Sequence, residues 1–138
     1  MKRPHVLRVE DGPEVFAPLL KALAAEGLRV GWLELAEPEP VPTSLAQAAR
    51  SGALRAVAVG VRGSVALKER KGPAVLSDVL REHFLGCRLV LLRGGDEQAT
   101  RLIPTSGGGW RVEPPSGAAR DLSTGELMTR LRRPRPWD

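Results

Sequence analysis

The turn between the first apolar run and the first helical stretch is where residue types and spacing first allow chemistry. Residues 5–9 read as a strand, and the apolar residues after Pro13 recur at helical spacing until Gly27. In an open parallel sheet, the turn after the first strand is where a phosphate usually binds, at the N-terminus of the following helix. Here the turn holds Asp11 and Gly12 between two glutamates. The turn is therefore in the usual place for a phosphate site, but its side chains are negatively charged and would repel a phosphate.

The motif that binds phosphates is missing from this turn. A P-loop has the pattern Gly-x-x-x-x-Gly-Lys-Ser/Thr, because its backbone N–H groups cradle the phosphates, its lysine neutralises them and its hydroxyl binds Mg²⁺. Counting forward from Gly12 puts alanine, proline and leucine at residues 17–19, in place of the second glycine, the lysine and the hydroxyl. The carboxylates of Glu10, Asp11 and Glu14 would also repel a triphosphate. We expect Asp11 and Glu14 to cap the helix; a carboxylate dyad is the alternative use of this pair.

Two arginine–glycine turns are the other candidates for binding chemistry. Arg93-Gly94-Gly95 follows the apolar run 87–92, at the carboxyl end of a predicted buried strand, where open α/β sheets bind ligands. Arg62-Gly63 follows the apolar run 56–61 in the same way. A guanidinium at either turn could bind an anion such as phosphate; the alternatives are a surface arginine beside a flexible turn and a solvated loop. The candidate ligand-binding residues are Asp11, Gly12, Arg62, Gly63, Arg93, Gly94 and Gly95.

No other residues have the spacing of a catalytic or metal site. The two histidines, His5 and His83, are far apart in the sequence. The single cysteine, Cys87, opens an apolar run, so we expect a buried, inert thiol and no disulfide. The sequence therefore predicts no catalytic residue and no metal ligand.

The elements that would position these turns alternate between strand and helix. This alternation predicts an α/β fold of three layers, with a mainly parallel sheet flanked by helices. From the length we expect a single α/β domain over residues 1–133, followed by a C-terminal tail over residues 134–138. The predicted strands cover residues 5–9, 28–35, 56–61, 87–92, 100–104 and 110–112, residues 64–67 form a short strand or a turn, and the predicted helices cover residues 13–26, 45–51, 75–84 and 124–132.

The composition is that of a soluble globular protein. Of the 138 residues, 42% are hydrophobic and 27% are charged. No run approaches the ~20 apolar residues of a transmembrane helix. The chain starts straight into a strand rather than a signal peptide. We therefore expect a cytoplasmic protein with no membrane contact.

The formal net charge is +5, and most of the excess lies at the C-terminal end. Aromatic residues make up only 4% of the chain and Tyr is absent, which argues against a base-stacking surface and against nucleic acid as a partner. We expect the arginine-rich end, residues 130–138, to be solvated. Contact with nucleic acid or with an acidic partner is the alternative.

Four stretches of the sequence share their order and spacing with a known family: residues 23–31, 44–59, 75–84 and 89–94. In these stretches the chain resembles the molybdopterin-guanine dinucleotide biosynthesis adaptor (MobB-like) family. The resemblance implies a P-loop NTPase-like fold, GTP as the bound nucleotide and a homodimer. It also implies a molybdopterin nucleotidyltransferase as the protein partner.

The chain departs from this family at the positions that would do chemistry. Besides the missing P-loop, Arg93 replaces the family's acidic residue after the later strand, and Glu34-Leu35-Ala36 replaces a basic run. We therefore expect a degenerate member: a non-catalytic adaptor or accessory protein with no intrinsic NTPase activity and no cofactor, since the residues do not support GTP. The alternative is a small anion- or nucleotide-binding protein that uses Arg93-Gly94-Gly95 in place of a P-loop. Weak nucleic-acid binding through residues 130–138 is a third hypothesis.

Overall fold

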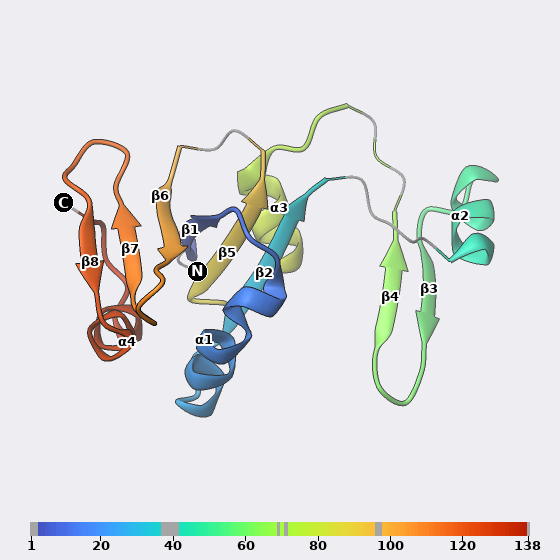
Figure 1. The fold of residues 1–138 in the computed structure, drawn as a ribbon. Helices are drawn as coiled ribbons and strands as arrows, with labels where there is room; N and C mark the ends of the chain where they lie inside the picture. The colour runs from blue at the N-terminus through green and yellow to red at the C-terminus, as the bar shows by residue number, and fades with distance from the viewer. Residues whose placement is uncertain (1–2, 37–41, 69, 71, 96–97, 138) are drawn as a thin grey trace. The chain divides into compact units, whose positions relative to one another are not determined.

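The chain divides into two compact units, which are described separately. We call them the main unit, Met1–Ala36 with Ala74–Asp138, and the hairpin unit, Glu37–Pro73. The computed structural model describes residues 3–36, 42–68, 70, 72–95 and 98–137 (Figure 1). The single domain predicted over residues 1–133 stays a prediction, because this division reflects contacts within the chain and not independent folding.

A six-stranded sheet forms the centre of the main unit, with the strand order β2-β5-β1-β6-β7-β8 (Figure 1). β1, β2, β5 and β6 are parallel to one another, and β7 and β8 complete the sheet as antiparallel strands. The prediction of an α/β fold with a mainly parallel sheet flanked by helices is confirmed. The last strand, β8, was not predicted. The strands are β1 (His5–Val9), β2 (Val30–Leu35), β5 (Leu89–Gly94), β6 (Thr100–Pro104), β7 (Trp110–Glu113) and β8 (Arg120–Leu122).

Helices cover both faces of this sheet. Leu89 and Leu91 of β5 belong to the core that also holds side chains of α1 and α4. On the opposite face, Gly31 of β2 lies against the ring of Phe84, which directly follows α3. Each of residues 89–92 is at most 2% exposed, because β5 is covered from both sides, and this explains its uninterrupted apolar run. The helices of the main unit are α1 (Pro13–Ala25), α3 (Leu76–His83) and α4 (Thr124–Arg132).

Aromatic rings form the centre of the core on the α1 and α4 side of the sheet. Phe16 of α1 is fully buried, and its ring centroid lies 5.9 Å from that of Trp32 and 5.7 Å from that of Trp110. Ring pairs at this spacing add about 0.5–1.5 kcal/mol beyond the burial of their area. These contacts hold α1 against β2 and β7, and so they hold the turn that precedes α1.

A capping box is present at the start of α4, and the capping predicted for α1 is absent. At the start of α4, Ser123 Oγ accepts a hydrogen bond from Glu126 N at 3.1 Å, and Glu126 Oε1 accepts one from Ser123 N at 3.2 Å. In α1 the N-cap is Gly12, and no side chain makes a capping hydrogen bond. The predicted capping by Asp11 and Glu14 is therefore wrong, because Asp11 lies one residue before the N-cap.

The C-terminal end is not simply a solvated tail. Trp137 packs against the core of the main unit. The guanidinium carbon of Arg130 lies 4.2 Å from the centroid of the Trp137 ring, and Arg130 Nη2 donates a hydrogen bond to the backbone oxygen of Pro136 at 2.8 Å. The prediction of a solvated end is wrong at Trp137, because one aromatic residue in a proline-rich segment has no periodicity that would mark it as packed.

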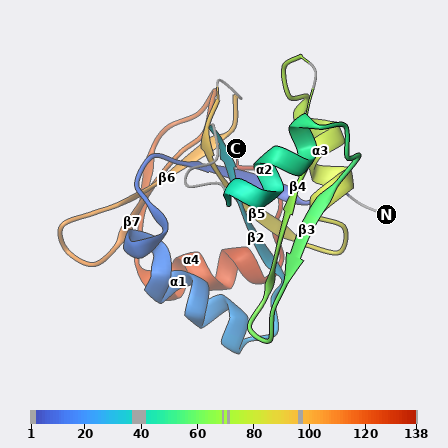
Figure 2. The same cartoon turned by 90° about the vertical axis from the view of Figure 1, so that its right-hand side faces the viewer.

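In its described residues, the hairpin unit holds one helix and two antiparallel strands (Figure 2). We predicted a strand over residues 56–61 that is buried on both faces, and this is wrong. Ala56 is only 7% exposed, but Val57 is 53% and Val59 is 79% exposed. A short apolar run suits a buried parallel strand and a half-covered hairpin equally well, and periodicity does not separate them. The elements of the unit are α2 (Thr43–Arg50), β3 (Ala56–Val59) and β4 (Ser64–Leu67).

Candidate functional site

The carboxyl ends of β1, β2 and β5 bring charged side chains together. Arg93 of β5 is the register partner of Glu34 of β2, and its Nη1 lies 3.0 Å from Glu34 Oε1. Arg93 Nε also donates a hydrogen bond to the backbone oxygen of Glu10, just after β1, at 3.3 Å. The guanidinium that was a candidate for binding an anion therefore already has two partners within the protein.

These ion pairs continue across β6 and β7. Arg101 Nη2 lies 2.8 Å from Glu10 Oε1, and Arg101 Nη1 lies 3.6 Å from Glu113 Oε1. Arg111 Nε lies 3.2 Å from Glu113 Oε2. Each pair is partly exposed and contributes at most about 1 kcal/mol to stability. The main effect of the set is that opposite charges neutralise one another. We call it the carboxyl-end network: Glu10, Glu34, Arg93, Arg101, Arg111 and Glu113.

The carboxylate of Glu14 lies over the turn between β1 and α1. A Cβ atom at Gly12 would be 2.6 Å from both carboxylate oxygens of Glu14, so this carboxylate lies against the backbone of the N-cap residue. The N-terminus of a helix carries a partial positive charge, and here a side chain of the protein meets that charge where a phosphate would bind. Asp11 is exposed in the same turn and adds a second negative charge.

Gly94 and Gly95 have a structural reason to be glycines. Their φ angles are +87° and +70°, in the left-handed region that other residues avoid. A Cβ atom on Gly94 would lie 2.8 Å from the backbone oxygen of Leu35, and one on Gly95 would lie 2.8 Å from Leu35 Cδ1. The close approach of β5 to the end of β2 therefore explains both glycines without a ligand.

Arg62 and Gly63 lie in the turn that joins β3 to β4 in the hairpin unit. Gly60 N donates a hydrogen bond to the backbone oxygen of Gly63 at 2.8 Å and closes this turn. We predicted that the turn follows a buried strand of the parallel sheet, which is wrong, because β3 pairs with the antiparallel β4. The turn therefore does not share a sheet with Arg93.

Sequence reasoning missed Arg8, Arg101 and Glu113. Arg8 Nη2 donates a hydrogen bond to the backbone oxygen of Gly95 at 2.9 Å, and the other two belong to the carboxyl-end network. Each is a charged residue inside a strand, which is typical of an exposed strand face. The partners of Arg8 and Arg101, Gly95 and Glu10, are distant in the sequence, so no local pattern marks these contacts.

The part of the chain that is described contains no cluster of three or more histidine, cysteine or carboxylate side chains that could hold a metal ion. Cys87 is a free, partly buried thiol. Among the same residues, no helix has the length and hydrophobicity needed to cross a lipid bilayer.

Comparisons with protein-family models, with curated proteins and with solved structures found no match for this chain. The fold defines an α/β protein with a mainly parallel sheet. Any conclusion about function therefore depends on the residues and geometry of the site.

Proposed function

We propose that this protein is a non-catalytic adaptor, which binds other protein chains on an α/β scaffold arranged like that of P-loop proteins. The observation that carries the proposal is the Glu14 carboxylate lying against Gly12, at the place where a P-loop would hold phosphate. The turn also lacks the lysine and the hydroxyl that a nucleotide with Mg²⁺ would need. We therefore propose that the protein has no NTPase activity and does not use GTP as a cofactor.

The strand order supports the P-loop-like part of the proposal. β1 lies inside the parallel sheet between β5 and β6, and α1 follows it directly. This is the position of a nucleotide-binding strand–turn–helix unit in open α/β sheets. The resemblance to the MobB-like family adds the proposed role: assistance in molybdopterin guanine dinucleotide biosynthesis, with a molybdopterin nucleotidyltransferase as partner.

The proposal includes a homodimer formed through the hairpin unit. The face of β3 that carries Val57 and Val59 is uncovered, and in the described residues β3 and β4 pair only with each other. A sheet of two strands is marginal alone. Two copies related by a twofold axis could pack these equivalent faces against each other, because such an interface is self-complementary.

The alternative function, anion binding by Arg93-Gly94-Gly95 in place of a P-loop, has less support. Arg93 is paired with Glu34 and hydrogen-bonded to the backbone oxygen of Glu10. An anion would have to displace the Glu34 carboxylate and would lie close to that of Glu10. The glycines are explained by their contact with Leu35.

Thermal unfolding with and without GTP and Mg²⁺ tests the proposal. A nucleotide at about 100 times its dissociation constant would stabilise the protein by about 2.7 kcal/mol, which corresponds to a rise of at least several degrees in Tm. We expect no change beyond that caused by MgCl₂ alone. The control is a P-loop GTPase measured under the same conditions. A clear rise with GTP, together with GTP hydrolysis, would rule the proposal out.

A further inference from the structure

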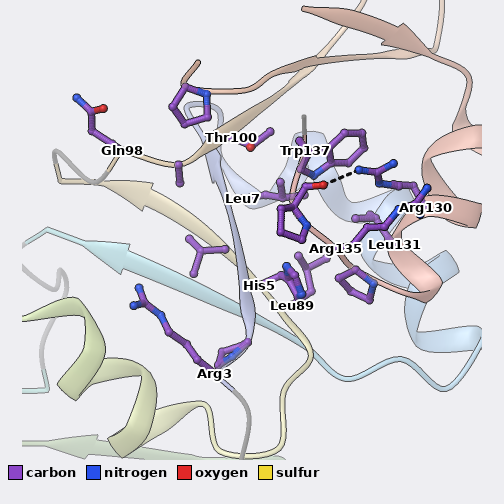
Figure 3. Close-up of a pocket in the computed structure, with 16 residues that line it drawn as sticks. Arg3, His5, Leu7, Leu89, Gln98, Thr100, Arg130, Leu131, Arg135 and Trp137 are labelled. Carbon is purple, nitrogen blue, oxygen red and sulfur yellow. Dashed lines mark hydrogen bonds between the residues drawn. The ribbon is translucent and has the colours of Figure 1, made fainter. Parts of the chain in front are cut away.

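Two cavities adjoin the C-terminal segment of the main unit, and Figure 3 shows the first of them. The first, of about 390 Å³, lies at the amino ends of β1, β5 and β6 and is lined there by His5, Leu89 and Thr100. The second, of about 620 Å³, is lined by β8, by α4 and by the C-terminal segment. Both volumes are in the range of about 300–1,000 Å³ that is common for small-molecule sites. We call the second cavity the arginine cavity.

The wall between the two cavities is an ordered part of the fold. Arg130, Pro134, Arg135 and Trp137 line both cavities. The hydrogen bond from Arg130 Nη2 to the backbone oxygen of Pro136, and the stacking of its guanidinium on Trp137, hold this segment in place (Figure 3). The C-terminal segment therefore forms a wall, and its arginines are presented by a folded structure.

The arginine cavity is lined by more positive charge than the contacts within the described residues account for. Its cationic lining residues come from β8, from the end of α4 and from the C-terminal segment, and they are Arg120, Arg130, Arg133 and Arg135. The one carboxylate among its described lining residues is that of Glu126, which already accepts the capping hydrogen bond of Ser123. Arg133 and Arg135 are exposed and form no ion pair with any described residue. Neither arginine is needed for the packing described above.

We propose that the arginine cavity binds a phosphate group through Arg133 and Arg135. All its cationic lining side chains are arginines, and a guanidinium presents a planar fork of donors that matches phosphate oxygens. A phosphate has oxygens pointing in several directions, so both arginines can bind the same group through different oxygens. The phosphate belongs to an organic phosphate or to the backbone of a nucleic acid. This inference goes beyond the proposed function and does not depend on it.

Calorimetric titration of the full chain at physiological ionic strength tests this site. The probes are inorganic phosphate, a short single-stranded oligothymidylate and polyglutamate. The test variant is R133Q/R135Q, and the matched control is R50Q/R55Q, which removes the same charge from exposed positions in the hairpin unit. We expect R133Q/R135Q to bind the phosphate probes about tenfold or more weakly than the wild type, since each substitution removes charge-assisted hydrogen bonds. We expect R50Q/R55Q to bind them like the wild type.

Several outcomes would overturn the proposal: no binding of either phosphate probe by the wild type, equal weakening in R50Q/R55Q, or polyglutamate bound as tightly as the oligothymidylate. Tighter binding of the oligothymidylate with a steep salt dependence supports a nucleic-acid phosphate. Binding of inorganic phosphate with no gain for the oligothymidylate supports an organic phosphate. A rise in Tm with GTP that disappears in R133Q/R135Q belongs to this site, whereas one that persists in this variant contradicts the proposed function.

Discussion

Single residues at the ends of β1 and β5 determine what this side of the sheet can bind. Glu14 places a carboxylate against Gly12 at the N-terminus of α1, and Arg93 is held by Glu34 and by the backbone of Glu10. A phosphate entering here would meet negative charge and a guanidinium that is already engaged. The chemistry of an α/β nucleotide site is therefore replaced by contacts within the chain.

At Gly94, we expect substitution by alanine to destabilise the fold. The left-handed backbone conformation and the approach of Cβ to within 2.8 Å of the Leu35 oxygen should together lower the free energy of unfolding by about 2–4 kcal/mol. Urea unfolding measures the effect. The control is Gly107→Ala, where a Cβ meets no atom within 4 Å and a change within about 0.5 kcal/mol is expected. Equal stability of the two variants would contradict the steric explanation.

Among the elements, α1 and α4 lie on the same face of the sheet and are joined by an ion pair (Figure 2). Arg132 donates from Nε and Nη2 to the two carboxylate oxygens of Glu26, both at 2.6 Å. Glu26 is the C-cap of α1, where the partial charge of the helix is negative and a carboxylate is unfavourable. The side-chain hydrogen bond from Arg132 lowers the pKa of Glu26 from its ordinary value of 4.5.

This pair should make the stability of the fold depend on acid pH. Since the pKa of Glu26 is lower in the folded state, its contribution to stability is present above pH 4.5 and is lost as the pH falls through the lowered pKa. We expect R132Q to be less stable than the wild type at neutral pH and equally stable once Glu26 is protonated in both. Urea unfolding at a series of pH values measures this, with D121N as the control. A stability difference that is the same at every pH would contradict the role of this ion pair.

At the scale of the whole molecule, the chain forms two units with different surfaces, and the hairpin unit is inserted between two segments of the main unit. In the main unit, helices cover the sheet, and the opposite charges of the carboxyl-end network neutralise one another. The hairpin unit has a two-stranded sheet with one apolar face uncovered. An exposed apolar strand face is either an interface with another chain or a surface prone to aggregation. This contrast favours a protein whose interactions with other chains go through the hairpin unit.

The proposed homodimer predicts the effect of substitutions on the exposed face of β3. V57K/V59K places two charges on this face and should convert the protein from dimer to monomer, because burying an unpaired charge in an interface is costly. Light scattering coupled to size-exclusion chromatography measures the mass. V15K, at a partly exposed position of α1 in the main unit, is the control and should leave the dimer intact. A wild-type protein that is a monomer at micromolar concentration would exclude the homodimer.

The sequence by itself determined the elements whose signals lie within a few residues. The first strand–helix–strand unit, the buried strand β5, the strands β6 and β7 and the helix α4 all appear where they were predicted. Apolar periodicity, glycine stops and the Ser123–Glu126 box are local properties of the chain, so they can be read without knowing the fold. The charge of the turn after β1 could be read from the sequence in the same way.

Only the tertiary structure decided which of these elements meet. β3 pairs with β4 and is not part of the six-stranded sheet. Arg101 of β6 forms an ion pair with Glu10, which follows β1, and Trp137 packs against the core. The arginine cavity likewise exists only because β8, α4 and the C-terminal segment come together. Such contacts depend on strand register and on packing between distant segments, and a sequence pattern of a few residues carries no information about either.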